Sequence, residues 1–375
     1  MWYDDYVINL NFSSFGILII EGVSLMPNVA VDLFCGVGGL THGLIQSGIN
    51  VVAGFDIDDS CKFAYESNND AIFYHKDINE LTPEELIQLY PENSIRLLTG
   101  CAPCQPFSKY TKRYRKDGHT DDKWRLLYSF ANLVTQTQPH IVSMENVPEL
   151  ARETVFIDFV NSLEQLDYHV DWRIVYCPDY GVPQHRKRLV LLASRFGEIN
   201  FIPPQYTPEN YLTVRSAIGN LPPIIDGEAH ENDPIHTSSK LSETNQLRMR
   251  QSVPGGTWRD WDESLQLNCH KKPSGRSYSA VYGRMKWDEP SPTITTQFYG
   301  YGNGRFGHPE QNRALSLREG AILQSFPPDY RFIEESMNFS RKGLGTHIGN
   351  AVPVNLGRAI GISIQNHLIE VGANG

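Results

Sequence analysis

The sequence contains few cysteines and no apolar run long enough to cross a membrane. Its 6 cysteines in 375 residues are too few and too scattered for a disulfide framework, so we expect reduced thiols in a cytosolic setting. An apolar segment near the N-terminus, FGILII, falls far short of the roughly 20 residues that a membrane span needs. The N-terminus also lacks the basic start and small-residue cleavage site of a signal peptide. Internal repeats and low-complexity tracts are absent.

Positively charged side chains are also fewer than negatively charged ones. The net charge of −10 argues against a protein that coats polyanions indiscriminately. Lys and Arg nevertheless gather locally, in KYTKRYRK (109–116) and over residues 245–306. An acidic body with local basic surfaces is typical of a protein that binds nucleic acid along one face. A solvated surface loop explains the same charges about equally well.

Residues 29–195 alternate strand-like and helix-like segments. The strand-like segments include VAVDLFCG, VVAGFDID, IRLLTG and IVSMENV, and the helix-like ones include LTHGLIQS and WRLLYSFANLVTQT. This alternation predicts an α/β fold with a doubly wound, mostly parallel, Rossmann-like sheet that binds ligands at the carboxyl ends of its strands. Two further strand-like segments, DWRIVYC and RLVLLAS, are expected to close the sheet as an antiparallel pair.

The composition changes after residue 195. Prolines and glycines then separate short polar runs, as in LPPI and VPGG, which predicts a second, smaller, loop-rich domain. Its length exceeds that of any ordinary loop and favours an element that recognises something large. We predict four units. Residues 1–26 form an N-terminal leader, with disorder as one alternative, and residues 27–195 form a catalytic and cofactor-binding domain. Residues 196–342 form the second domain, and residues 343–375 form a C-terminal helix that returns to the catalytic domain.

The glycine-rich segment DLFCGVGGL follows the first predicted strand and opens a helix. Its glycines allow a ligand to approach the backbone closely, and the helix N-terminus favours a negative group. Thr41 stands where the dinucleotide pattern G-x-G-x-x-G needs its third glycine, so NAD is disfavoured. Asp56 and Asp77, after the second and third strands, could bind ribose hydroxyls and an adenine amino group. S-adenosylmethionine is the leading candidate ligand, although a simple tight turn would also account for the glycines.

Cys101 and Cys104 form a C-x-x-C pair after another predicted strand. No second pair exists elsewhere, so we predict no structural zinc site and no other metal. Pro103 and Pro106 favour an extended loop and disfavour a thioredoxin-like redox pair, which should open a helix. An inert buried thiol is therefore a poor description of Cys104, which we expect to be presented to a ligand.

Taken together, these segments resemble the cytosine-5 DNA methyltransferase family. GCAPCQPFS is similar to the family's proline-cysteine loop, SMENV to its glutamate motif, QHRKR to its Q-x-R-x-R motif and DLFCGVGG to its cofactor motif. RALSLREGAILQSFP and GNAVPVNLGRAIG match its two C-terminal motifs in order. One departure is Cys101, where a second glycine is common in the family.

The resemblance implies an enzyme that transfers a methyl group from S-adenosylmethionine to carbon 5 of a flipped-out cytosine in a specific duplex DNA sequence. Carbon 5 becomes nucleophilic when the Cys104 thiolate adds to carbon 6. Glu145 would hydrogen-bond ring nitrogen N3 and donate a proton. By resemblance, Asn146 orients the loop, Arg186 contacts the ring and the carboxylate, and Arg188 holds the loop or a phosphate.

The resemblance also assigns binding residues. Those expected to bind S-adenosylmethionine are Phe34, Gly36, Gly38, Gly39, Leu40, Asp56, Ile57, Asp77, Ile78, Pro103, Asn350 and Ala351. Those expected to contact DNA are Gln105, Ser108, Lys109, Thr293, Thr295 and Arg305. The segment after Cys104 has the length and charge of a closing lid that touches phosphates, an untethered loop being the alternative. Residues 290–306 carry side chains able to read base edges, and the second domain is therefore the expected target-recognition domain.

Three other functions compete with this one. An RNA cytosine methyltransferase of the same fold is disfavoured by the long second domain and by the lack of the Cys-Phe-Thr tripeptide of the transfer-RNA relative. A non-catalytic DNA-binding relative would be expected to lose Cys104 or Glu145, and an NAD oxidoreductase has no need of Cys104. The expected partners are double-stranded DNA and a cognate restriction endonuclease acting on the same site. We expect a cytoplasmic, bacterial or phage-encoded monomer without membrane association.

Overall fold

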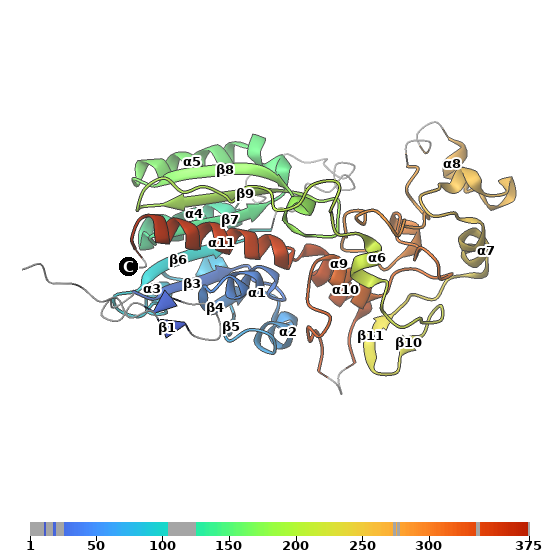
Figure 1. Cartoon of the computed structure of the whole chain (residues 1–375), viewed down its shortest axis with the longest axis horizontal. Coiled ribbons are helices and arrows are strands. Elements are labelled where there is room, and N and C mark those ends of the chain that lie inside the picture. The colour runs from blue at the N-terminus through green and yellow to red at the C-terminus, as the bar shows by residue number, and fades with distance from the viewer. Residues whose placement is uncertain are drawn as a thin grey trace, which may run out of the picture.

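A seven-stranded sheet forms the N-terminal half of the chain in the computed structural model (Figure 1). The structure describes residues 11–12, 18–19, 26–103, 125–272, 275, 278–334 and 338–373. In sheet order the strands are β5 (Ile72–His75), β4 (Asn50–Asp56), β3 (Asn28–Leu33), β6 (Ile95–Gly100), β7 (Ile141–Asn146), β9 (Lys187–Ser194) and β8 (His169–Tyr176). The first five run parallel, while β9 is antiparallel to both of its neighbours. The predicted doubly wound sheet and its closing antiparallel pair are confirmed.

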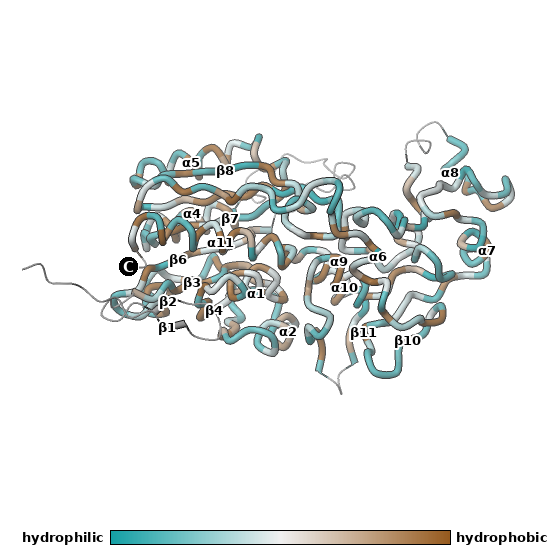
Figure 2. Tube along the Cα trace, viewed as in Figure 1, coloured by the Kyte–Doolittle hydropathy of each residue, from teal (hydrophilic) through white to brown (hydrophobic). Residues whose placement is uncertain are grey.

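Alternation along the strands sends apolar side chains to both faces of the sheet. In β6, Leu98 joins a core with α4 and α5, while its neighbour Leu97 joins a core with α1 and α11. Figure 2 shows hydrophobic colour along these central strands. The helices of this half, together with the C-terminal helix, are α1 (Gly39–Gln46), α2 (Lys62–Glu66), α3 (Pro83–Ile87), α4 (Arg125–Thr137), α5 (Thr154–Gln165) and α11 (Val354–Glu370).

Local sequence signals set several helix ends. Thr82 caps α3 by accepting from the Glu85 amide at 3.2 Å, and the Glu85 carboxylate accepts from the Thr82 amide at 2.9 Å. Pro83 occupies the first helical position, where its missing N–H costs nothing. These contacts satisfy backbone amides at the start of α3 that would otherwise lack a partner within the helix.

Loops dominate the chain beyond the sheet, and this region extends away from it (Figure 1). Figure 2 shows hydrophilic colour around α7 and β10. The elements of this region are α6 (Val214–Ile218), β10 (Ala229–His230), β11 (Asp233–Thr237), α7 (Glu243–Gln251), α8 (Asn268–Lys271), α9 (Leu317–Leu323) and α10 (Arg341–Asn350). A shared apolar core joins α9 and α10 to Val37 and Cys61 of the sheet half, so the two regions are packed together rather than merely tethered.

A buried ion pair anchors the start of α9. Arg313 donates from both terminal nitrogens to the Glu319 carboxylate, at 2.6 and 2.8 Å. Burial alone would raise the pKa of Glu319, but the hydrogen bonds and charge of Arg313 lower it to about 2. Ser316 and Glu319 also form a reciprocal cap at this helix end.

The predicted domain boundaries remain predictions, but the structure adds detail at both ends. Within the leader, Asn11–Phe12 (β1) pairs antiparallel with Leu18–Ile19 (β2). At the other end, α11 packs against α1 of the sheet half. Among the residues described, there is no helix with both the length and the apolar character to cross a membrane.

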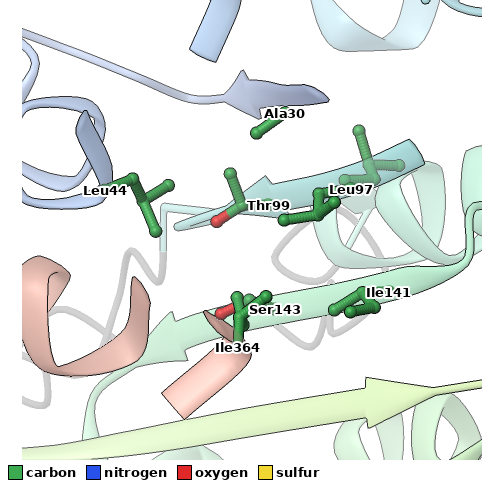
Figure 3. Close-up of a pocket in the computed structure, with 8 residues that line it drawn as sticks. Ala30, Leu44, Leu97, Thr99, Ile141, Ser143 and Ile364 are labelled. Atoms are coloured by element: carbon green, nitrogen blue, oxygen red, sulfur yellow. The ribbon is translucent and has the colours of Figure 1, made fainter. Parts of the chain in front are cut away.

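An internal void lies between the sheet and the α1 and α11 helices (Figure 3). Its lining is apolar except for the hydroxyls of Thr99 and Ser143, which have no hydrogen-bond partner within the described structure. The void is too narrow for a water molecule. It is therefore a packing defect and not a candidate substrate site.

The contact between α1 and α11 generates a stability prediction. A Cβ added to Gly43 would lie 2.3 Å from the Val354 carbonyl oxygen and 2.5 Å from the Arg358 amide, both of them backbone atoms. We expect Gly43→Ala to lower the free energy of unfolding by about 1–3 kcal/mol, because the two helices must separate. Gly343→Ala, in α10 with nearest neighbour Ser340 at 3.4 Å, is the matched control and should leave stability unchanged or slightly higher. Equal destabilisation of both variants in urea titrations would contradict the packing argument.

Candidate active site

The candidate residues gather where the strand order reverses. β3 lies between β4 and β6, so the loops after β3 and β6 leave the same sheet edge in different directions. The glycine-rich segment follows β3, and Cys101 to Pro103 follow β6. Pro103 is exposed, whereas Cys104 lies outside the described residues.

Glu145, near the carboxyl end of β7, is buried with only 2% of its surface exposed. The Cys101 thiol donates to its Oε2 at 2.8 Å. Arg188 Nε lies 2.8 Å from its Oε1, but the N–H is not aligned for a hydrogen bond, and Oε1 has no hydrogen-bond partner among the residues described. The carboxylate charge is thus compensated while one of its oxygens retains its hydrogen-bonding capacity.

Asn146 ties the end of β7 to the segment that leads toward Cys104. Its Nδ2 donates to the Ala102 carbonyl at 3.0 Å, and its Oδ1 accepts from the Val147 amide at 2.9 Å. The side chain is buried, so these bonds are shielded from water. This geometry agrees with the predicted role of orienting the loop, which stays a prediction.

Arg186 does not make the carboxylate contact that the resemblance implied. Arg188 takes that place. Arg186 is buried and donates to the Ile294 carbonyl at 3.0 Å and, more weakly, to Gly349 at 3.4 Å. Burial, reinforced by the charge of Arg188, lowers the pKa of Arg186 to about 9. Main-chain carbonyls from two distant segments bind its terminal nitrogens, whereas its Nε has no hydrogen-bond partner among the residues described. The role predicted for Arg186 at the reacting ring stays a prediction.

The glycine-rich turn leaves open space for a ligand. Phe34, Gly36 and Gly38 have positive φ angles of 62°, 51° and 88°. A Cβ added to Gly36 would meet no atom within 4 Å, whereas one at Gly38 would lie 2.8 Å from Asn69 Nδ2. Gly38 caps α1 without a side-chain hydrogen bond, so the helix start offers amides to an anion.

Asp56 is held at the end of β4 beside this turn. Its Oδ2 accepts from the Gly36 amide at 2.8 Å and its Oδ1 from the Asp58 amide at 2.9 Å. The next residue, Ile57, is 66% exposed, which is unusual for an isoleucine beside a polar loop. A fixed carboxylate and an exposed apolar surface suit a ribose and the face of an adenine ring.

The other predicted cofactor residues fall into two groups. Asp77 caps a 3₁₀ turn by accepting from the Asn79 amide at 2.9 Å, and Ile78 and Leu40 point into the core. The C-terminal pair is brought close to the glycine-rich turn, since a Cβ on Gly39 would lie 2.3 Å from the Val352 carbonyl oxygen. Asn350 is exposed at the end of α10, and Ala351 is half-buried.

Sequence reasoning missed the buried carboxylate beneath the turn. Thr41, which argued against NAD, donates to Asp32 Oδ2 at 2.7 Å, while Asp32 Oδ1 has no hydrogen-bond partner in the described chain. Burial raises the pKa of Asp32 to about 7, although the bond from Thr41 opposes that change. The sequence signal was present, since Asp32 opens the DLFCGVGGL segment.

Two long-range contacts at this edge had no sequence signal. Tyr330 donates to the Val37 carbonyl at 2.5 Å, joining residues 293 positions apart. His347 Nε2 lies 2.9 Å from Asp58 Oδ2 and links α10 to the loop after β4. The first contact holds a C-terminal segment against the glycine-rich turn, and the second holds α10 against the loop after β4.

One cluster of metal-ligand type occurs in the described part of the chain. Single ligand atoms of Asp58, Cys61 and His347 lie within 4.8 Å of one another. Asp58 and His347 are already bonded to each other, and burial raises the pKa of the Cys61 thiol, which keeps it protonated. We assign no metal site to this cluster.

The predicted recognition segment docks beside the candidate active site. Thr293 donates to the His185 carbonyl at 2.5 Å, and the Ile294 amide donates to Gln184 Oε1 at 2.8 Å, whereas Thr295 is exposed. Arg305 donates to the carbonyls of Gly256 and Arg284, so part of its guanidinium binds the protein's own loops. Gln105, Ser108 and Lys109 lie outside the described residues.

Comparisons with known proteins agree on one family. Residues 29–366 match the family described as C-5 cytosine-specific DNA methylase. The Type II methylase M.HgiDII of Herpetosiphon aurantiacus is 55% identical over 346 residues, which cover 92% of this chain and 96% of that protein. Type II methyltransferase M1.HphI of Haemophilus parahaemolyticus is 31% identical over 88% of this chain and 84% of its own.

The solved structures show the same fold. A putative DNA modification methyltransferase encoded within a prophage of E. coli superposes with a TM-score of 0.69 at 21% identity, covering 91% of this chain and 99% of that one. The DNMT2 of Spodoptera frugiperda, solved as a mutant, superposes with a TM-score of 0.61 at 17% identity, covering 92% and 99%.

The Glu145–Arg188 pair generates a stability prediction. We expect Arg188→Ala to lower the free energy of unfolding by about 3 kcal/mol, because it leaves an uncompensated carboxylate in the interior. Adding Glu145→Gln should recover part of the loss, since the buried charge is then gone. Arg215→Ala, which breaks the solvent-exposed pair with Asp288, is the control and should change stability little. Denaturant unfolding measures all four proteins, and equal effects of the two arginine substitutions would contradict the prediction.

Proposed function

Because this chain belongs to the C-5 cytosine-specific DNA methylase family, we propose that it methylates carbon 5 of a cytosine extruded from duplex DNA, through a covalent bond from Cys104 to carbon 6. The observation that carries this proposal is the buried Glu145 carboxylate beside the segment that leads into Cys104. The enzyme class and the fold follow from the family. Base extrusion, the covalent adduct and the residue roles are the proposed part.

Cys104 acts as the nucleophile. Its thiolate adds to carbon 6, and the electron pair displaced from the 5,6 double bond makes carbon 5 enamine-like and reactive toward a methyl cation equivalent. Once carbon 5 carries the methyl group, a water or weak base removes the proton from carbon 5. The electron pair of that C–H bond re-forms the double bond and expels the Cys104 thiolate, which closes the cycle.

Glu145 handles the charge that develops on the ring. Oε1 is buried and without a hydrogen-bond partner in the described structure, so it can meet ring nitrogen N3 when the carboxyl carries a proton. Arg188 remains beside it and compensates the carboxylate when the proton has left. Asn146 fixes the distance between β7 and the Cys104 segment through the Ala102 carbonyl.

The cofactor site fits S-adenosylmethionine. The open space at Gly36, the anchored Asp56 and the exposed Ile57 would receive the ribose and the adenine, and the amides at the start of α1 would receive the carboxylate. Asn350 and Ala351 would close the far side. When bound, S-adenosylmethionine supplies the electrophilic methyl group.

The loop-rich region supplies target choice. Thr293 and Thr295 lie on a segment that is hydrogen-bonded to Gln184 and His185. Residues of this segment that contact a base edge would therefore be held directly beside the catalytic residues.

We propose double-stranded DNA as the substrate and a cognate restriction endonuclease as the companion activity. We also propose that the enzyme is a monomer that works in a bacterial cytoplasm. Bisulfite sequencing of plasmid DNA from expressing cells tests the activity and reads out the target sequence together.

Replacing the nucleophile is the direct test of the covalent step. Cys104→Ser should abolish methylation and covalent trapping by duplex DNA containing 5-fluorocytosine, because a serine hydroxyl is not ionised at neutral pH. Binding of S-adenosylmethionine, measured by calorimetry, should be retained. Cys269→Ser, at an exposed cysteine, is the control and should trap DNA like the native protein. An adduct formed by Cys104→Ser would show that another residue attacks the ring.

Replacing Glu145 should lower the rate of methylation far more than it weakens the binding of S-adenosylmethionine. We expect Glu145→Gln to lower kcat by roughly a hundredfold or more, because the amide cannot pass a proton to N3. The dissociation constant for S-adenosylmethionine should change little. Single-turnover methylation with tritiated S-adenosylmethionine measures the first quantity, and near-native turnover would remove Glu145 from the mechanism.

A further inference from the structure

We propose that Cys101 is a positioning residue: its thiol holds Oε2 of Glu145 and so leaves Oε1 as the oxygen that meets the cytosine ring. This inference rests on the proposed function, because it assigns a role within that reaction. It concerns the position at which the resemblance led us to expect a departure from the family's pattern, with a cysteine in place of a glycine. A glycine has no side chain that could donate to the carboxylate.

The contact is close and charge-assisted. Cys101 Sγ lies 2.8 Å from Glu145 Oε2, a short separation for a sulfur donor. A neutral thiol is a weak donor, but an ionised acceptor strengthens the hydrogen bond and shortens it. Glu145 is almost fully buried, so water does not compete with the thiol for Oε2.

The two oxygens of Glu145 are therefore unequal. Oε2 accepts a hydrogen bond from the Cys101 thiol. Oε1 lies 2.8 Å from Arg188 Nε, but the N–H of Arg188 is not aligned with it for a hydrogen bond. A carboxylate with both oxygens unbonded could rotate about its terminal torsion, which is broad and has no strong preference. The thiol removes this freedom, so the oxygen left for the base is defined before the base arrives.

The main chain that carries the thiol is held in place. The Cys101 amide donates to the Leu33 carbonyl at 3.3 Å, and the next residue, Ala102, is held through its carbonyl by Asn146. These bonds connect position 101 to the ends of β3 and β7. A thiol carried on a fixed main chain is better placed to orient a neighbouring carboxylate than a thiol on a mobile segment.

A purely structural role is the alternative, since Cys101 also packs against the core beneath α1 and α11. Two replacements separate these roles. Cys101→Ala keeps an apolar side chain but cannot donate, and Cys101→Ser keeps a donor of similar size. We expect Cys101→Ala to lower kcat about tenfold with an unchanged KM for S-adenosylmethionine, and Cys101→Ser to retain most of the native kcat. Cys269→Ala is the control and should change neither constant.

The spectroscopic test is independent of activity. The infrared S–H stretching band of Cys101, isolated as the difference between the native protein and Cys101→Ser without DNA or cofactor, should lie at lower frequency than that of exposed Cys269. In a Glu145→Gln background the Cys101 band should move to higher frequency, because the acceptor has lost its charge. A band that does not respond to Glu145→Gln, or a Cys101→Ser variant as slow as Cys101→Ala, would overturn the positioning role.

The two proposals fail in different ways. If the native protein methylates no cytosine, the proposed function is lost, yet the Cys101 band can still report the contact with Glu145. If the native protein methylates DNA through Cys104 but the band or the serine rescue fails, only the role of Cys101 is lost.

Discussion

The buried carboxylate of Glu145 is the constraint on which the rest of this site depends. An ionised group in the interior is costly unless it is paired, and Arg188 and Cys101 compensate it from two different strand ends. Those strand ends must therefore stay together, because separating them would leave the charge unpaired. The same pair brings the glutamate motif, the Q-x-R-x-R motif and the segment before Cys104 to one point.

A second polar network joins the sheet half to the loop-rich region. Gln184 is fully buried, donates to the Leu323 carbonyl at 3.1 Å and to Gln324 Oε1 at 2.8 Å, and accepts from the Ile294 amide. Arg186 adds bonds to Ile294 and Gly349. Gln184 and Arg186 are both buried, so a shift of either region would leave more of their donors without partners. It is therefore a physical connection between the segment proposed to read DNA and the edge proposed to carry out the chemistry.

The cofactor edge uses a different arrangement. Carboxylates concentrate there, with Asp32 beneath the glycine-rich turn and Asp56 and Asp58 beside it. Each is held by amides, a hydroxyl or His347, and these contacts support the left-handed backbone of the turn. The C-terminal helices complete this edge from the far end of the chain.

Much of this protein was determined by its sequence alone. Apolar periodicity and helix caps are local properties, so the strands, the helices and the closing antiparallel pair could be predicted from them. The position of Glu145 at a strand end and the left-handed turn at Gly36 and Gly38 were also predictable, because each depends on neighbouring residues. Which arginine meets the carboxylate depended on the tertiary structure, since the choice between Arg186 and Arg188 was made by carbonyls more than a hundred positions away. The Cys101 contact and the Tyr330 bond likewise join separate segments, and only folding brings those segments within hydrogen-bond distance.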